Sequence, residues 1–426
     1  MAARRLNQVS GFPTFTIHSL LGFNGDYFSY NETNTLDYDV VVLDEAGMVN
    51  IHLFYALLRA LKPTTRLIII GDDAQLPPIG AGFIFSDIIS KQIVPTVRLS
   101  KVFRQSKDSV INIFAKQIRR GIIPKNCTNR FRDWFYISCS KKQFKNPYNI
   151  LNNKNNNSKR PQDSVNEKIL NILRKLSISA KDQIQDILLD FQILVPQRSG
   201  LLGYDNLNNE IQKIFNNPDN IDENNKIYKS NRWFCINDKI IHLENRDMKC
   251  IKYFKDYDQL TTAFINNNNN TIYTNELYEQ SNSPFYHKRI YNGTLGVIKH
   301  IDLENDMIIA QMITGDYVIY DPIEAKDIFD LAYVLTVHKA QGSEFKNVVI
   351  PFSLSNFIML NNQWFYTAIT RAKYQIIIIA EDNAFKMACK NTETKKRNTW
   401  LKLFDSVTNK RLETYYENID FKLQKS

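Results

Sequence analysis

Two segments of the sequence carry side chains that suit phosphate chemistry. In the first, Asp44 and Glu45 follow the apolar run Val40 to Leu43, and in the second, Arg371 follows Thr370. Mg²⁺ prefers one or two carboxylates beside phosphate oxygens, so we assign Asp44 to a metal ion and Glu45 to polarising an attacking water. An arginine across a cleft can stabilise charge that develops during phosphoryl transfer. Taken alone, Asp44 and Glu45 could also cap the following helix, and Arg371 could also be a surface residue at the end of a helix.

Two further segments could reach a phosphate. Gln75 lies in the segment 71–80, GDDAQLPPIG, whose glycine and paired prolines predict a stiff turn. The side chain of Gln75 could then contact a terminal phosphate on one side and a further group on the opposite side. Arg104 lies in the segment 99–106, and its guanidinium matches phosphate oxygens bidentately. The alternatives are a rigid surface loop and an exposed arginine at a helix start.

A polar segment between two apolar runs predicts contact with a ligand. Residues 336–345, TVHKAQGSEF, are mostly polar, charged or Gly, although they connect two predicted strands. A long polar connection at a strand end usually contacts a ligand. Thr336, His338 and Gln341 could touch a nucleic-acid backbone, and Glu344 could hydrogen-bond a ribose. His338 also fits a structural histidine that is satisfied within the fold.

Several familiar sites are absent from the sequence. No Gly is followed by Lys, so there is no phosphate-binding loop of the Gly-Lys-Ser/Thr kind. The five cysteines, at 127, 139, 235, 250 and 389, contain no CxxC pair, which argues against a disulfide framework or a structural zinc site. Neither an HExxH spacing nor a Ser/His/Asp order stands out. We therefore expect reduced thiols in an intracellular protein.

The composition is that of a soluble globular protein with a basic balance. The 426 residues are enough for two or three domains, and 43% are apolar and 23% charged. The net charge of +10 and pI near 9.1 either favour a polyanionic partner such as nucleic acid or follow from an Asn/Lys/Ile-rich composition. No apolar run approaches the roughly 20 residues of a membrane span. We expect no membrane partner, and a location in the cytoplasm or in an organelle with an AT-rich genome.

The apolar runs are short, β-branched and bounded by polar or turn residues. Such runs are typical of buried parallel strands, and helical patterns at Ile51 to Leu61 and Ser109 to Arg120 lie between them. Alternating strands and helices predict doubly wound α/β domains, in which ligands bind beyond the carboxyl ends of the strands. The predicted strands are Val40 to Leu43, Leu67 to Ile70, Ile193 to Val195, Tyr333 to Leu335, Val348 to Ile350 and Ile376 to Ala380.

The hydrophobic pattern changes between Trp233 and Asp327, where short apolar runs alternate with turn residues such as Asn292-Gly293. This pattern predicts a small antiparallel β domain inserted into the second α/β domain. Asn/Lys-rich stretches at 141–168 and around 266–270 predict solvated insertions. The predicted division is a first α/β lobe at 1–105, a second lobe at 106–231 with the 141–168 insertion, a β subdomain at 232–328, and the rest of the second lobe with a basic tail at 329–426.

Taken in order, these segments resemble the motifs of superfamily 1 helicases, specifically the RecD-like branch (the exodeoxyribonuclease V alpha subunit family). Residues 2–6 and 15–21 resemble its early DNA-contacting motif, 43–46 the Walker B motif, and 71–72 with 75–78 motif III. Residues 103–105 resemble motif IV, 194–208 the opening of the second motor domain, 337–345 motif V and 366–372 motif VI. Seven motifs in one order make a chance agreement implausible.

The resemblance implies two RecA-like parallel-sheet lobes, the first of them incomplete, with an inserted SH3-like β subdomain. It implies a motor that couples ATP hydrolysis to 5′-to-3′ movement on single-stranded DNA, with ATP and Mg²⁺ as cofactors and a cleft that closes on ATP. Asp44 would serve Mg²⁺, and Glu45 the attacking water. The other residues implied at the nucleotide are Gln75, Arg104, Arg371, Glu344 and Gly342, and those implied along the DNA are Thr16, His18, Thr336, His338 and Gln341.

The sequence departs from the family at the phosphate-binding loop, which the family carries upstream of its first matched motif. Residue 1 falls where that region should already have ended, and the first strand of the lobe is missing too, which would expose a sheet edge. Three explanations stay open: a fragment of a longer gene, half of a split motor completed by a separate chain, or a relative that binds DNA without hydrolysing ATP. The alternatives to a motor are a non-hydrolysing nucleic-acid-binding module and an accessory subunit of a helicase–nuclease complex.

Overall fold

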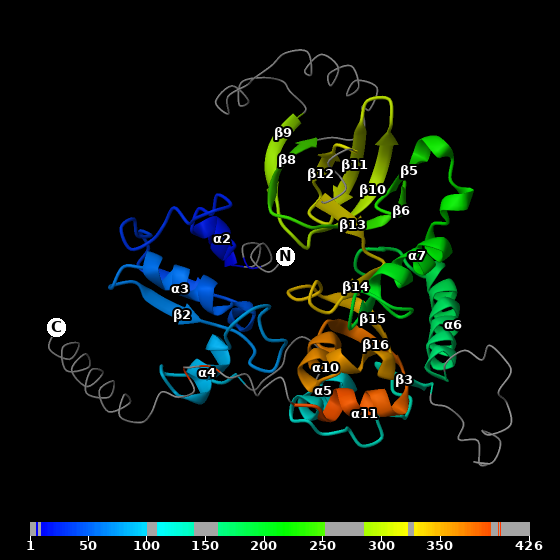
Figure 1. Cartoon of the computed structure of the whole chain (residues 1–426), viewed down its shortest axis with the longest axis horizontal. Coiled ribbons are helices and arrows are strands. Elements are labelled where there is room, and N and C mark those ends of the chain that lie inside the picture. The colour runs from blue at the N-terminus through cyan, green and yellow to red at the C-terminus, as the bar shows by residue number, and fades with distance from the viewer. Residues whose placement is uncertain are drawn as a thin grey trace.

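The chain forms two bodies of unequal size in the computed structural model (Figure 1). The smaller body contains the N-terminal elements, drawn in blue, and the larger body contains most of the rest. The structure describes residues 6, 10–99, 109–139, 161–251, 285–322, 328–392, 399 and 401, without the side chains of 161–163. Arg104 and most of the predicted insertion at 141–168 therefore lie outside the described residues.

A two-stranded parallel sheet is the centre of the smaller body. Its strands are β1 (Val40–Leu43) and β2 (Arg66–Ile69), and α3 (Ile51–Ala60) packs on one face. Leu43 is buried in the same core as Leu57 of α3. The side chain of Asn50 starts α3 by accepting a hydrogen bond from the amide of Leu53. The other described helices of this body are α2 (Ile17–Leu20), the 3₁₀ helix η1 (Ala46–Met48) and α4 (Ile84–Ser90).

In the part of the larger body that the structure describes, five strands form a wholly parallel sheet. Their spatial order is β14 (Val334–Thr336), β4 (Phe191–Val195), β15 (Phe345–Phe352), β16 (Ala372–Ala380) and β3 (Trp134–Ser138). Central strands such as β4 are buried almost throughout, as expected when helices cover both faces of a parallel sheet. The helices are α5 (Val110–Arg119), α6 (Pro161–Lys181), α7 (Tyr204–Phe215), η6 (Leu354–Met359), α10 (Asn362–Ile369) and α11 (Asp382–Lys390).

An antiparallel sheet is inserted in the chain between α7 and β14. Its order is β13 (Phe329–Leu331), β7 (Lys239–His242), β10 (Leu295–Asp302), β11 (Met307–Met312), β12 (Tyr317–Tyr320), β8 (Arg246–Ile251) and β9 (Phe285–Ile290). A separate ribbon pairs β5 (Lys226–Lys229) with β6 (Arg232–Cys235), after the 3₁₀ helices η3 (Pro218–Asn220) and η4 (Glu223–Asn225). The chain returns to the parallel sheet directly after β13.

Among the described residues, the main hydrophobic core runs through both sheets of the larger body, and a small separate cluster lies on the antiparallel sheet. The smaller body has a core of its own. The shared core includes Ile193 of the parallel sheet and Ile308 of the antiparallel sheet. It also includes Leu76, although the chain before Leu76 belongs to the smaller body. The two bodies therefore meet at Leu76.

The predicted fold class is confirmed, because two parallel α/β sheets flank an inserted antiparallel sheet. The SH3-like character of the insert and the domain boundaries stay predictions. All five cysteines are buried, and the structure joins none of them in a disulfide bond. Within the described ranges, no helix is long and apolar enough to cross a membrane.

Candidate functional site

The acid pair follows β1 in a strained turn. Asp44 is exposed, and its Oδ1 accepts a 2.8 Å hydrogen bond from the amide of Glu45. Glu45 is half-buried and has a left-handed backbone, with φ of +51°. A non-glycine residue in this region stores about 1–3 kcal/mol of strain, and such residues cluster at functional sites. The turn presents both carboxylates at the carboxyl end of the sheet, which is where an α/β sheet binds its ligands.

The loop after β2 lies directly against the turn after β1. The amide of Ala46 donates to the carbonyl of Ile70 over 2.9 Å. A Cβ atom on Gly71 would lie 3.2 Å from the nitrogen of Ala46 and 3.0 Å from the ring of Phe85. A Cβ atom on Gly47 would lie 3.2 Å from the carbonyl oxygen of Asp72. Glycine at these two positions therefore lets the two loops pack together.

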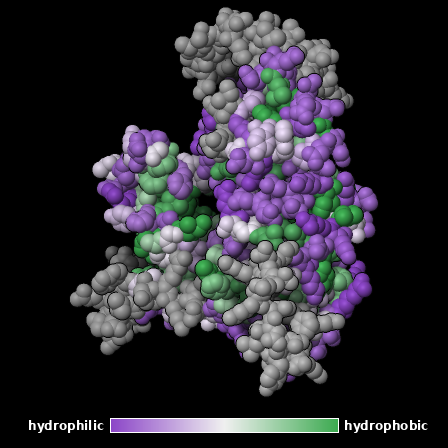
Figure 2. Space-filling view, turned by 45° about the vertical axis from the view of Figure 1, so that its right-hand side comes forward, coloured by the Kyte–Doolittle hydropathy of each residue, from purple (hydrophilic) through white to green (hydrophobic). Residues whose placement is uncertain are grey.

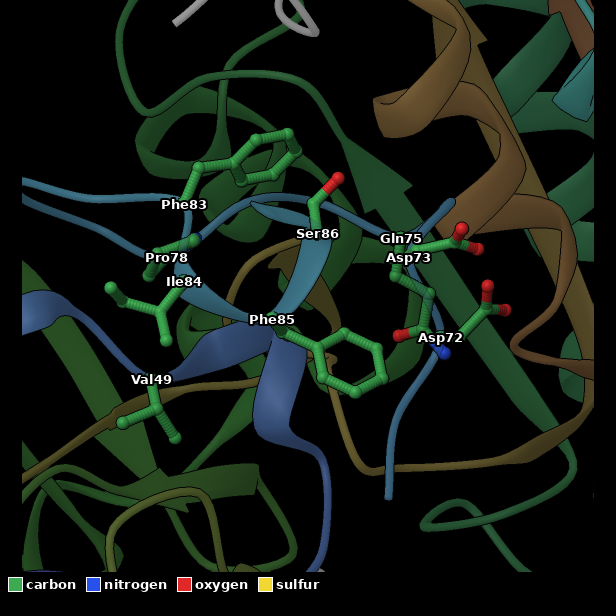
Figure 3. A pocket seen from close by; sticks show the side chains of 10 residues that line it. Val49, Asp72, Asp73, Gln75, Pro78, Phe83, Ile84, Phe85 and Ser86 are labelled. Atoms are coloured by element: carbon green, nitrogen blue, oxygen red, sulfur yellow. The ribbon is translucent and has the colours of Figure 1, made fainter. Parts of the chain in front are cut away.

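Gln75 lies in the loop after β2, and the oxygen of its side-chain amide is buried. Its Oε1 is fully buried and accepts no hydrogen bond from any of the described residues. An orphaned buried acceptor is uncommon in proteins and needs an explanation such as a missing ligand or water. Figure 3 shows Asp72, Asp73 and Gln75 close together at one end of a pocket whose other end is lined by Phe83, Ile84 and Val49. Gln75 is therefore in a position to meet a polar ligand at this edge.

Hydrogen bonds tie this loop to the larger body. The amide of Leu76 donates to Oγ1 of Thr367 over 2.8 Å in a buried contact, and the hydroxyl of Tyr366 donates to Oδ2 of Asp72 over 2.8 Å. Both partners lie on α10, which ends just before Arg371. Burial, helped by the Asp72 carboxylate, raises the pKa of Tyr366, so the hydroxyl remains a donor at neutral pH. The segment that resembles motif III is therefore bonded to the segment that resembles motif VI.

Arg119 of α5 supplies a second tie between the two bodies. Its guanidinium forms an ion pair with Asp73, and its Nη2 lies 3.7 Å from Oδ1 of Asp72. Burial opposes the charge on Arg119, but the two carboxylates outweigh it and raise the pKa of the guanidinium. Asp73 also pairs with Arg98 at 3.3 Å.

Arg371 is held within the larger body rather than extended into solvent, with only 1% of its surface exposed. Its Nε donates to the carbonyl of Thr367 over 3.2 Å, its Nη1 to the carbonyl of Ser343 over 3.3 Å, and its Nη2 to Oγ1 of Thr370 over 3.3 Å. These bonds link the end of α10 to the polar segment 336–345. Arg371 thus lies one helical turn from the Leu76–Thr367 contact.

The polar segment 336–345 is half-buried in the larger body. Burial lowers the pKa of His338, which favours the neutral ring. The Nε2 of Gln341 is buried and has no hydrogen-bond partner among the described residues, and Gly342 has a φ of +73° that suits glycine. Glu344 is half-buried just before β15.

The two predicted DNA-contacting residues of the smaller body lie on α2. Thr16 caps that helix, with its Oγ1 accepting from the amide of Ser19 over 3.2 Å. His18 is exposed, and its ring packs edge-on against Phe23 at 5.4 Å between centroids. No hydrogen bond in the described ranges joins either residue to the segment 336–345. The structure thus brings together the acid pair, Gln75 and the α10 segment, while the DNA-contacting candidates remain on separate elements.

Sequence reasoning missed the residues that join the two bodies. Asp72 and Asp73 were visible beside Gln75, and Tyr366 and Thr367 beside Arg371, but nothing in the sequence paired them. Arg119 carried no signal at all, because it lies in an ordinary amphipathic helix.

Two family models match the chain. One, described as an AAA domain, matches residues 1–135, and the other, described as a UvrD-like helicase C-terminal domain, matches residues 331–379. The first covers the acid pair and Gln75, and the second covers the segment 336–345 and Arg371.

Curated relatives match nearly the whole chain at low identity. The ATP-dependent RecD2 DNA helicase of Deinococcus radiodurans is 26% identical over 94% of this chain and 44% of its own length. The RecBCD enzyme subunits RecD of Haemophilus influenzae and of Buchnera aphidicola subsp. Schizaphis graminum are 24% and 26% identical, over 88% and 90% of this chain and 56% and 61% of their own lengths. The chain therefore spans about half the length of these relatives. Among solved structures, the Pif1 helicase from Candida albicans matches with a TM-score of 0.44 and 15% identity, over 90% of this chain and 84% of that one.

Proposed function

We propose that this chain, which belongs to the RecD-like branch of superfamily 1B helicases, couples ATP hydrolysis to 5′-to-3′ movement along single-stranded DNA. The observation that best supports this proposal is a junction between the two bodies. There, the loop that contains Asp72 and Gln75 is hydrogen-bonded to Tyr366 and Thr367. This junction gathers groups from both bodies at the carboxyl edge of the β1–β2 sheet. A nucleotide bound there would touch both bodies, as a motor driven by cleft closure requires.

The acid pair fits a magnesium–nucleotide ligand. Asp44 offers an exposed carboxylate at a strand end, and Mg²⁺ at nucleotides is usually held by one or two carboxylates together with phosphate oxygens and water. The ion, when bound, would neutralise charge on the phosphates. We assign Asp44 to that ion and Glu45 to the attacking water, whose proton the Glu45 carboxylate would accept.

The remaining nucleotide contacts come from both bodies. The unpartnered Oε1 of Gln75 can accept a hydrogen bond from the attacking water and so orient it. Arg371 and Arg104 would offset charge on the γ-phosphate, and Glu344, with Gly342 beside it, would meet the ribose. For Arg371, this role requires its guanidinium to exchange one of its carbonyl partners for a phosphate oxygen.

We assign the DNA to a path across both bodies. Thr16 and His18 would contact it on the smaller body, and Thr336, His338 and Gln341 on the larger one. The net charge of +10 supports a polyanionic ligand, and a neutral His338 can donate to a phosphate oxygen without adding charge. By analogy with the relatives named as RecBCD subunits, the motor would act within a helicase–nuclease complex, in the cytoplasm or in an organelle with an AT-rich genome.

The test is ATP hydrolysis with and without single-stranded DNA, by the chain alone and with a phosphate-loop segment fused ahead of residue 1. We expect the fused form to hydrolyse ATP with DNA stimulation, and Glu45→Gln to lower the rate roughly 100-fold or more, as loss of a general base does. Duplexes with a 5′ or a 3′ single-stranded tail then test the direction of movement. Salt-sensitive DNA binding without any nucleotide dependence in the fused form would instead identify a non-hydrolysing binding module.

A further inference from the structure

A broad groove lies between the two bodies. It is lined by Leu58 of the smaller body and by Arg119 and Tyr366 of the larger one, and Figure 2 shows the hollow, with the smaller body on the left. The hydrogen bonds and ion pairs that join the bodies at the candidate site all meet the loop 72–76. Contacts at a single loop hold the bodies together but leave the smaller body free to turn about that loop.

The C-terminal part of the chain leaves the larger body beside the end of α5. After α11 ends at Lys390, the carbonyl of Asn391 accepts a hydrogen bond from the amide of Asn362 over 2.8 Å. Thr392 then packs on Gly121, which follows the C-cap of α5, because a Cβ atom on Gly121 would lie 3.2 Å from Cγ2 of Thr392. The larger body therefore holds the chain as far as Thr392.

Thr399 contacts the smaller body instead. Its Oγ1 donates a 2.5 Å hydrogen bond to Oδ2 of Asp87 on α4, and Leu401 lines the groove together with residues 83–90. Asp87 is 1% exposed, and its Oδ1 has no partner among the described residues. A buried carboxylate needs hydrogen-bond donors, and Thr399 supplies the one that the described residues offer. The chain has therefore crossed from one body to the other between Thr392 and Thr399.

This crossing is the second between the two bodies. The first leads from Leu99 of the smaller body to Ser109, the N-cap of α5, and the second starts beside the other end of α5. A ten-residue helix is about 15 Å long, so the two crossings meet the larger body at separate points. One crossing lets a body swivel freely, whereas two crossings at separate points restrict it to a hinge motion.

We propose that the segment from Thr392 to Thr399 is a strap that limits how far the two bodies can separate. Seven residues of chain reach at most about 25 Å, so α4 stays within that distance of the end of α5 while Thr399 is bonded to Asp87. Breaking this bond removes the limit and lets the smaller body turn further away from the larger one. The strap is independent of the proposed function, because it joins the bodies whether or not the chain binds nucleotide or DNA.

Double electron–electron resonance on the full chain, without nucleotide or DNA, tests the strap. Spin labels are attached through Tyr38→Cys in the smaller body and Ile178→Cys on α6, because both positions are exposed whereas the five native cysteines are buried. We expect one narrow distribution of distances in the labelled chain. Thr399→Val should make that distribution roughly twofold wider and extend it to longer distances. Thr399→Ser, which keeps the hydroxyl, should leave it unchanged.

Hydrogen exchange at the amides of residues 84–91 reports whether the bond between Thr399 and Asp87 is formed. Thr399→Val should speed this exchange roughly tenfold, because the buried carboxylate of Asp87 loses its donor. A further variant inserts Gly-Ser-Gly-Ser-Gly-Ser between Thr392 and Glu393, which lengthens the strap by about 20 Å and leaves Thr399 intact. Exchange should then stay slow, while the distance distribution widens.

Three results would overturn the proposal. If exchange at residues 84–91 is the same in Thr399→Val and in the unmodified chain, the bond is not formed in solution. If Thr399→Val speeds exchange but leaves the distances unchanged, Thr399 stabilises α4 without restraining the bodies. If Thr399→Val widens the distances but the insertion does not, the cause is a weakened α4 and not the length of the segment that joins the bodies.

Discussion

The hydroxyl of Tyr366 donates to Oδ2 of Asp72 over 2.8 Å and so joins residues 294 positions apart. One residue further along α10, Thr367 accepts from the amide of Leu76 over 2.8 Å. Because both bonds join the loop of Asp72 and Leu76 to α10, the loop and the helix should move together. Any shift of α10 is therefore transmitted to Gln75, which lies between Asp72 and Leu76 in the chain.

Thr367→Val should destabilise the protein, because it leaves the buried amide of Leu76 without an acceptor. Such an unsatisfied group costs about 1–3 kcal/mol in the free energy of unfolding. Thr367 also donates to the carbonyl of Gln363 over 2.7 Å, and valine cannot. Urea unfolding checks the prediction, with Thr367→Ser as the control that keeps the hydroxyl. Equal stability of the valine variant and the wild type would show that the contact is not formed in solution.

Arg119→Ala should have a small and salt-dependent effect on stability. The Arg119 side chain is 38% exposed, so its pairing with Asp73 contributes about 0–1 kcal/mol after solvent screening. The loss should shrink further in 1 M salt, because the Debye length falls to about 3 Å there. Thermal unfolding at low and high salt measures it. Arg174→Ala removes an ion pair of similar exposure within the larger body and serves as the control. A large, salt-independent loss for Arg119→Ala would point to packing rather than charge.

Arg371→Ala should abolish hydrolysis in the fused form that carries a phosphate-binding loop. An arginine that offsets charge in the transition state contributes a factor of about 10³–10⁵ in rate. Arg371→Lys should rescue only part of the activity, since lysine cannot reproduce the three bonds to Thr367, Ser343 and Thr370. Steady-state ATP hydrolysis and nucleotide binding are measured in parallel. Unchanged hydrolysis by the alanine variant would exclude the assigned role.

Lys239 should make the protein more stable as the pH rises above neutral. Burial at the junction of the two sheets lowers its pKa to about 7, although Asp186 and Asp190 oppose this. Between the folded pKa and the ordinary value of 10.5, the unfolded chain binds a proton that the folded chain does not. Stability therefore rises with pH in this window, by at most about 1.4 kcal/mol per pH unit. Urea unfolding at pH 7, 8 and 9 measures the slope.

The matched variant is Lys239→Met, which keeps the length of the side chain without its charge. The wild type minus this variant isolates Lys239 from other groups that titrate in the same window. We expect the difference in unfolding free energy to move in favour of the wild type as the pH rises. The loss of the bond from Nζ to Oε1 of Gln192 should appear as an offset that does not change with pH. A flat difference would mean that Lys239 stays protonated in the folded protein across this pH range, so that its pKa is not lowered by folding.

The sequence predicted the elements far better than the contacts between them. The acid pair, Gln75 and Arg371 each follow or precede a strong local pattern, and the structure places the first two together at one sheet edge. The burial of Arg371 under α10 could not be predicted, because it depends on packing between segments far apart in the chain. Arg119 was missed for the same reason. The exposure of Val40, Val42 and Ile68 on one face of the β1–β2 sheet could not be predicted either, since an apolar strand has the sequence pattern of a buried one whether or not a partner is present.

Leu76 sits in the core of the larger body while its own loop extends from the sheet of the smaller one. A side chain that is buried in this way acts as a pivot. Removing it from the core would cost more free energy than rotating the chain around it. We therefore expect the smaller body to rock about Leu76 rather than glide past α10. Such a rotation would widen or narrow the space beside Gln75, while Leu76 would stay in the core of the larger body.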